Sequence, residues 1–292
     1  MLQSEILRIA EKEGVPPDTI DKDWVLGHFL AGLYRNNWAH DNLVFKGGTC
    51  LRKCYFPDYR FSEDLDFTLR DTNLQITSKI LQSTCEAVMA QTGIRFSQSK
   101  IEPVTWKDRQ VGYISVIQFW GANHQKVHQP PDTKRWLTKI KIEITHYEKI
   151  INDPVLRPLL SNYSDSKLFQ QIRIPCYSLA EIISEKFRAL LQRSYPAPRD
   201  YYDLWKLLQQ TEQKSWELIL STFKQKIVFK NIFFKNYEDF FNEEQIKKMK
   251  RAWDNSLQNV LREKELPDVQ EVIDELNEFC HKMSWKQVFN EM

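Results

Sequence analysis

The chain is poor in the features that would assign it to a disulfide-rich, zinc-binding or membrane class. Its 292 residues include five cysteines, an odd number without any Cys-x-x-Cys pair, so no disulfide framework or common zinc motif is indicated. No apolar run approaches the roughly 20 residues of a membrane-spanning helix, and the N-terminus lacks the apolar region of a signal peptide. We therefore expect a cytoplasmic protein that does not bind membranes.

The net charge is also small. The 41 Lys and Arg residues nearly balance the 39 Asp and Glu residues, which leaves a formal charge of +2. Because this gives no broad positive field, a nucleic acid would have to be bound by a local basic cluster. The run Gln245–Arg251 contains four basic residues. It is either an ordinary solvated helix face or the edge of a groove for RNA.

Two of the cysteines, Cys50 and Cys54, are spaced four residues apart in a predicted helix. This spacing could form half of a zinc site. The sequence shows no histidine or cysteine cluster that would supply the remaining ligands, so buried and reduced thiols are the favoured interpretation.

The most informative segments lie close together near residue 50. A strand-like run, Leu43–Phe45, ends in Lys46 and is followed by two glycines and Thr49. A second apolar run then carries Asp64 and Asp66, which would project from the same face of a strand.

Either motif alone is weak, because glycine pairs are common in turns and alternating Asp is common in half-exposed strands. Together, the glycine pair and the two aspartates indicate a site for a phosphate group and a metal ion. Gly47 and Gly48 would let the backbone N–H groups approach a polyphosphate closely. Asp64 and Asp66 would repel each other unless they shared a divalent cation. A phosphate cradle beside a metal-binding carboxylate pair is what phosphoryl or nucleotidyl transfer requires.

The order Lys46-Gly-Gly-Thr-x-Leu-Arg52, followed by the run Arg60–Phe67, resembles the AbiEii/AbiGii toxin nucleotidyltransferases. These proteins, which include the MenT-like toxins, belong to the DNA polymerase β-like superfamily. The superfamily's usual Gly-Ser is Gly48-Thr49 here, which keeps the hydroxyl. Further matching segments are Asp21–Trp24, Glu185–Ala189 and Arg199–Trp205.

The resemblance implies a metal-dependent enzyme that transfers NMP from an NTP to a hydroxyl acceptor and releases pyrophosphate. The acceptor would be the 3′ end of a tRNA, and the cofactor Mg²⁺ or Mn²⁺. The protein would be the toxin of a bacterial toxin–antitoxin system active in abortive infection, a form of phage defence, with a cognate antitoxin as its partner. Asp64 and Asp66 would hold the metal, while Lys46, Gly47, Gly48 and Thr49 would bind the nucleotide's phosphates.

A third carboxylate is Glu143, in the strictly alternating run Lys139–Thr145. This run is either a solvent-facing strand with cross-strand salt pairs or, by resemblance, the strand that carries the third acidic residue of the superfamily. In the second case Glu143 would bind the metal or accept the proton of the attacking hydroxyl.

Two more residues are assigned through the resemblance. Lys186 would contact the nucleotide, a task that suits the point charge of a lysine. Asp203 would orient Lys186, Arg199 or the nucleotide, whereas Asp200 is explained by the favourable dipole at the start of its helix.

The pattern of elements predicts an α+β fold, with a nucleotidyltransferase-type mixed sheet and flanking helices followed by an all-helical C-terminal domain. Residues 1–165 would form the core, and residues 166–292 a helical domain that completes the nucleotide pocket and binds the RNA acceptor. We expect a helix over Thr72–Thr92 and a strand over Arg95–Glu102.

Two other functions remain open at this point. A metal-dependent nuclease also uses paired carboxylates but has no need of a glycine cradle. A non-catalytic nucleotide- or RNA-binding module would keep the fold without the chemistry.

Overall fold

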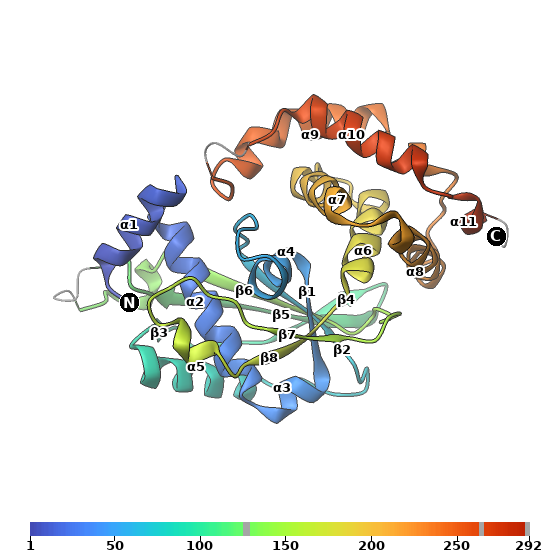
Figure 1. Cartoon of the computed structure of the whole chain (residues 1–292). Helices are drawn as coiled ribbons and strands as arrows, with labels where there is room; N and C mark the ends of the chain where they lie inside the picture. The colour runs from blue at the N-terminus through green and yellow to red at the C-terminus, as the bar shows by residue number, and fades with distance from the viewer. Residues whose placement is uncertain (125–128, 263–265, 290–292) are drawn as a thin grey trace. The chain divides into compact units, whose positions relative to one another are not determined.

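The N-terminal part of the chain folds around a mixed β-sheet. The computed structural model describes residues 1–124, 129–262 and 266–289. Seven strands of its eight-stranded sheet pair in the order β3-β5-β6-β2-β1-β8-β7, and the eighth, β4, pairs with β5 (Figure 1). The strands are β1 (Leu43–Lys46), β2 (Asp64–Leu69), β3 (Arg95–Phe96), β4 (Glu102–Trp106), β5 (Arg109–Trp120), β6 (Lys139–Thr145), β7 (Val155–Pro158) and β8 (Arg173–Cys176).

The sheet is mixed because two of its pairings are parallel. β2 runs parallel to β6, and β1 runs parallel to β8, while the other neighbours are antiparallel. The parallel pairs join strands that are far apart in sequence, as parallel pairing requires a crossover connection. The expected α+β class with a mixed sheet is confirmed.

Helices accompany this sheet in the first unit. They are α1 (Gln3–Glu13), α2 (Pro17–Tyr34), α3 (Asn37–Asn42), α4 (Gly47–Cys50), a π-helical turn (Leu51–Tyr55) and α5 (Ser78–Thr92). α2 begins with Pro17, which suits the first helical position, and packs against α1 and α5. Because Trp24, Phe29 and Leu30 are all buried, α2 is a core helix rather than a surface helix.

Two predicted boundaries in this region are wrong. The helix expected from Thr72 begins only at Ser78, because the Asp71 side chain accepts a hydrogen bond from the Asn73 amide (2.9 Å) and forms a turn instead. The strand expected over Arg95–Glu102 is interrupted after Phe96. Here the Ser97 hydroxyl accepts a hydrogen bond from the Gln118 amide (3.0 Å) in place of a ladder carbonyl.

The chain divides into two compact units. Unit 1 contains residues 1–148 and 154–176, and unit 2 contains residues 149–153 and 177–292. β8, which the sequence placed after a boundary at residue 165, pairs with β1 within unit 1.

The described residues of unit 2 form helices and their connections. These helices are α6 (Leu179–Gln192), α7 (Pro198–Gln210), α8 (Trp216–Phe229), a 3₁₀ turn (Tyr237–Phe241), α9 (Glu243–Leu257), α10 (Val269–Lys282) and α11 (Lys286–Phe289). Five aromatic side chains pack edge-to-face, tilted or stacked, with centroid distances between 5.0 and 6.3 Å: Phe187, Phe223, Phe234, Phe240 and Trp285. This aromatic cluster forms the core of the unit. None of the helices described is long and apolar enough to cross a membrane.

A buried ion pair attaches the short segment 149–153 to unit 2. Glu181 and Lys226 are both fully buried, with Lys226 Nζ 2.9 Å from Glu181 Oε1. Glu181 also accepts hydrogen bonds from the backbone amides of Ile151 (2.8 Å) and Asn152 (3.0 Å), and Lys226 donates to the carbonyl of Lys149 (2.9 Å). Each charge is therefore paired and hydrogen-bonded, as burial demands.

We predict that Lys226→Met destabilises the protein by about 3–5 kcal/mol, because Glu181 is left as an unpaired buried charge. The free energy of unfolding in urea measures this change. Lys214→Met is the control, since Lys214 forms an exposed pair with Glu212 and its loss should cost within about 0.5 kcal/mol. Equal effects of the two substitutions would contradict the assigned role of the buried pair.

Candidate active site

The glycine pair lies directly against the second motif. β1 and β2 are antiparallel, with Lys46 opposite Asp66. The chain then turns into α4 at Gly47, whose φ of +78° is in the left-handed region. A Cβ at Gly47 would collide with the Asp66 carboxylate, and one at Gly48 would lie 2.8 Å from Arg60 Nη2. Glycine at position 47 is thus required by both backbone conformation and space.

The three predicted carboxylates lie on one face of the sheet. Asp64 and Asp66 are half-buried on β2, whereas Leu65 and Phe67 between and after them are fully buried in the core. β6 pairs with β2 in parallel, and Glu143 is the partner of Asp66. Because paired residues of adjacent strands project from the same face, Asp64, Asp66 and Glu143 share one face of the sheet.

Lys46 lies on the same face, since it is opposite Asp66 on the other side of β2. The structure therefore brings a lysine, two aspartates and a glutamate from three adjacent strands together. Oxygen ligands of this kind suit a hard divalent cation such as Mg²⁺ or Mn²⁺.

The electrostatics of this face are governed first by burial of Asp64. Burial raises the pKa of Asp64 above its usual value, and Glu63 and Glu143 raise it further, while Lys22 and Lys141 oppose the shift. Lys141 forms an ion pair with Glu143, and this contact raises the pKa of Lys141. A half-buried carboxylate that is costly to ionise gains from a bound cation.

Thr49 ties the glycine turn to β2. Its side chain is buried, and its hydroxyl donates a hydrogen bond to the backbone carbonyl of Asp64 (2.5 Å). Gly47 and Gly48 remain partly exposed. The hydroxyl thus fixes the position of the turn relative to the first aspartate.

A buried carboxylate, that of Asp23, pairs with two basic residues in the segment after the glycines. Asp23 on α2 is 3% exposed and lies 2.8 Å from Arg52 Nε and 2.6 Å from Lys53 Nζ. The hydroxyl of Tyr163 donates to the same carboxylate (2.6 Å). Burial alone would raise the pKa of Asp23, but the charges of Arg52 and Lys53 outweigh it and lower the pKa to about 2.

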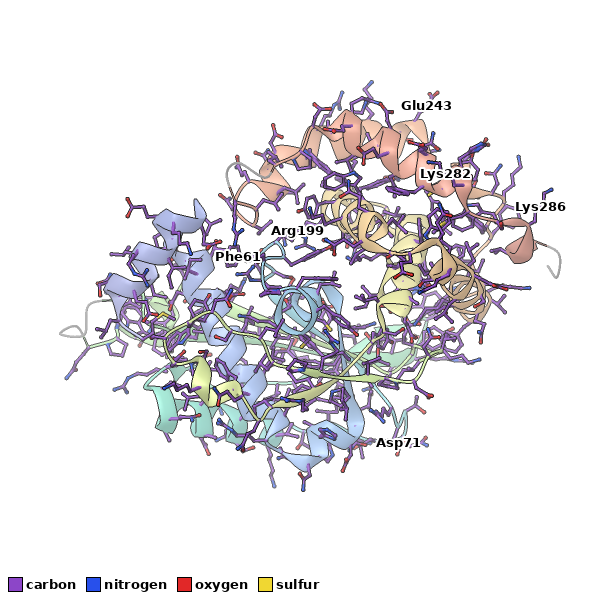
Figure 2. All side chains as sticks on the ribbon, viewed as in Figure 1. Phe61, Asp71, Arg199, Glu243, Lys282 and Lys286 are labelled. Atoms are coloured by element: carbon purple, nitrogen blue, oxygen red, sulfur yellow. The ribbon has the colours of Figure 1, made fainter. Side chains whose placement is uncertain are left out.

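Arg52 also fills the space before β2. Its guanidinium lies 3.6 Å from the ring centre of Phe61. Figure 2 labels Phe61, which precedes β2, and Asp71, which follows it, at opposite ends of the strand. The sequence did not reveal the ion pairs of Asp23, which was noted only as part of the matching segment Asp21–Trp24.

In unit 2 the structure brings Lys186 and Asp203 together. Lys186 on α6 has its Nζ 2.5 Å from Asp203 Oδ2 on α7 and 3.0 Å from Asp200 Oδ1. Arg193 pairs with the other oxygen of Asp200 (2.5 Å). Both aspartates are buried, so the charge of Lys186 is held in a fixed position by two carboxylates rather than by one.

Comparison with known proteins gives the class of the chain. The family model "Nucleotidyl transferase AbiEii toxin, Type IV TA system" matches residues 28–275. The chain therefore belongs to the AbiEii nucleotidyltransferase toxin family, and it is a nucleotidyltransferase. The resemblance drawn from the two motifs is confirmed, and the nuclease and the non-catalytic module are set aside.

Solved structures show the same fold. One is MenT4, a nucleotidyltransferase toxin from Mycobacterium tuberculosis H37Rv, with 18% identity, a TM-score of 0.65, and coverage of 98% of this chain and 92% of that one. Another is JHP933 from Helicobacter pylori, with 16% identity, a TM-score of 0.54, and coverage of 95% and 96%. No curated protein sequence matched the chain.

Two glycines with the same backbone conformation test the close packing at Gly47. Gly93 has a φ of +77°, but a Cβ there would meet nothing within 4 Å. We predict that Gly93→Ala and Gly47→Ala each lose about 1–2 kcal/mol to left-handed strain. Only Gly47→Ala should also displace Asp66 and abolish nucleotidyl transfer. Urea unfolding and transfer assays on both variants check this, and full activity in Gly47→Ala would contradict it.

The ion pairs of Asp23 predict an acid sensitivity. Because its pKa is lower in the folded than in the unfolded chain, the unfolded state binds more protons between about pH 4 and pH 2. The contribution of Asp23, about 2 kcal/mol, is therefore complete above this window and is lost as the pH falls through it. Denaturant titrations at several pH values should show a shallower acid dependence for Asp23→Asn. An identical slope in both proteins would contradict the assignment.

Proposed function

We propose that the protein transfers a nucleoside monophosphate from an NTP to a hydroxyl acceptor, the 3′ end of a tRNA. The observation that carries this proposal is the strand register that aligns Lys46, Asp66 and Glu143 across β1, β2 and β6, with Asp64 on the same face. Family membership supports nucleotidyl transfer, and the register supports these four residues as the ones that would perform it.

Asp64 and Asp66 would hold the divalent cation, and Glu143 would either be a third ligand or accept the proton of the acceptor hydroxyl. A bound Mg²⁺ or Mn²⁺ would neutralise the charge of the triphosphate. The backbone N–H groups at Gly47, Gly48 and Thr49 would face the phosphates, since the turn has no side chains there to keep a ligand away.

The residues of the chain then account for the bond changes. The acceptor oxygen forms a bond to the α-phosphorus, and the bond from this phosphorus to the bridging oxygen breaks. Pyrophosphate leaves with the electron pair, and Lys46 stabilises its charge. The proton of the acceptor hydroxyl passes to a carboxylate on this face of the sheet, for which Glu143 is the candidate.

Lys186 would contact the nucleotide. Asp200 and Asp203 already hold its ammonium group in place, so less conformational entropy is lost when a phosphate is bound. The two aspartates would act as positioning residues.

The acceptor and the biological setting follow from the family. Its type IV toxin–antitoxin description supports a cognate antitoxin as partner and a role in abortive infection. α9 offers a basic surface to an RNA, although Lys248 pairs with Glu244 (2.6 Å) and Lys250 with Gln270 (2.5 Å). An RNA would have to replace these exposed and weak contacts.

The proposal predicts that purified protein, Mg²⁺ and one α-labelled NTP place label on small RNA in a total RNA preparation. A nuclease would instead shorten the RNA without incorporating label. Each of the four NTPs is tested separately, and fractionated tRNA identifies the acceptor. Absence of label with all four nucleotides would refute the proposed reaction.

Asp66→Asn should lower transfer at least about 10³-fold, because the metal loses a ligand. Its stability should change by no more than about 1 kcal/mol. Asp71→Asn is the matched control, since Asp71 is exposed beyond the far end of β2 (Figure 2), and the activity of this variant should be unchanged. Full transfer by Asp66→Asn would contradict the metal assignment.

Lys46→Ala should weaken NTP binding while leaving the fold intact.

A further inference from the structure

Three of the five cysteines converge in the core of unit 1. Cys50 ends α4, Cys54 lies in the π-helical turn that follows, and Cys176 ends β8. Their three sulfur atoms lie within 4.8 Å of one another, and all three side chains are fully buried. The third member was not expected from the sequence, which offered only the pair Cys50 and Cys54.

The backbone explains why these three meet. Residues four apart on a helix lie on the same side, which brings Cys50 and Cys54 together. The turn from Leu51 to Tyr55 closes with a hydrogen bond from the Phe56 amide to the Leu51 carbonyl (2.8 Å), so the chain is locally wider than an α-helix. Cys176 arrives through the parallel pairing of β8 with β1, where it is the partner of Phe45.

The spacing fits a small thiophilic ion. With metal–sulfur bonds of about 2.3 Å, three thiolates around one ion have sulfur–sulfur distances of about 3.8–4.0 Å. The present arrangement is already within 1 Å or so of this geometry. No histidine, aspartate or glutamate of the described residues joins the group, so the ligand set is sulfur alone, which selects Zn²⁺ or Cu⁺ over harder cations.

The surroundings suit such a complex. Three thiolates around Zn²⁺ or Cu⁺ carry a net negative charge, and a buried negative charge needs a positive neighbour. Arg157, which is half-buried on β7, donates from Nε to the backbone carbonyl of Cys54 (3.1 Å). Its guanidinium therefore lies beside the cluster.

We propose that Cys50, Cys54 and Cys176 form a three-thiolate site for one thiophilic d¹⁰ cation, either Cu⁺, whose coordination three thiolates complete, or Zn²⁺, which would also need a fourth ligand. The ion is taken up as the chain folds, because the sulfur atoms are closed to solvent in the folded protein. The ion would join α4 and the π-helical turn after it to β8. Because Cys50 directly follows Thr49, this link would stiffen the support of the glycine turn. This site is independent of the proposed transfer reaction.

The test measures the bound ion rather than the activity. The full chain is unfolded in denaturant with a phosphine reductant and refolded with Zn²⁺, with Cu⁺ supplied as its acetonitrile complex, or with neither. After desalting, native mass spectrometry and elemental analysis should find about one ion per chain in one of the metal arms. Thermal melting of the loaded protein should occur at a higher temperature than that of the metal-free protein.

Variants locate the ion. Cys50→Ser and Cys176→Ser should each lose it, whereas Cys85→Ser and Cys280→Ser should retain it, since both of these cysteines are buried but lie outside the cluster. Circular dichroism confirms that each variant folds.

The wild-type protein decides the question even where a variant does not fold. A wild-type chain that refolds without binding either ion, or whose melting temperature neither ion raises, overturns the proposal. Undiminished ion content in a folded Cys176→Ser or Cys50→Ser variant overturns it as well, because the ion would then be held elsewhere. Loss of the ion in Cys50→Ser and Cys176→Ser, with retention in Cys85→Ser and Cys280→Ser, supports the proposal.

Discussion

The register of three adjacent strands is the constraint on which the site depends. Leu65 and Phe67 are fully buried on β2, and their burial decides which face the two aspartates occupy. A slip of one residue would turn Asp64 and Asp66 into the core and expose the apolar residues. The hydrophobic core thus sets the direction of the carboxylates, and the pairings with β1 and β6 then supply Lys46 and Glu143 on either side.

The features that could be predicted from the sequence are those that local residue patterns encode, namely strands and helix ends. Alternation located β2 and β6, and the expected helix end at Thr92 agrees with α5, which Gly93 follows in a left-handed conformation. The start of α5 was missed because one side-chain hydrogen bond at Asp71 replaces the first turns of the expected helix. β7 and β8 were missed as well, since each is short and includes a proline, Pro158 in β7 and Pro175 in β8.

The supports of the site could not be predicted, because a buried lysine and a solvated one look alike in a sequence. Lys53 and Lys226 are both buried against carboxylates from other segments. In the same way, Cys176 joins Cys50 and Cys54 only through the pairing of β8 with β1. Motifs identified the reacting groups, but the partners that hold them come from contacts between distant parts of the chain.

The anchoring of residues 149–153 in unit 2 has a consequence for how this protein can evolve. The chain passes between the units three times, at residues 148/149, 153/154 and 176/177. A gene fragment that ends after Cys176 therefore does not encode a self-sufficient module, since it includes a segment whose amides belong to Glu181. The helical unit cannot be exchanged for another as a simple C-terminal cassette. Recombination that respects the fold would have to carry two separate stretches of the gene together.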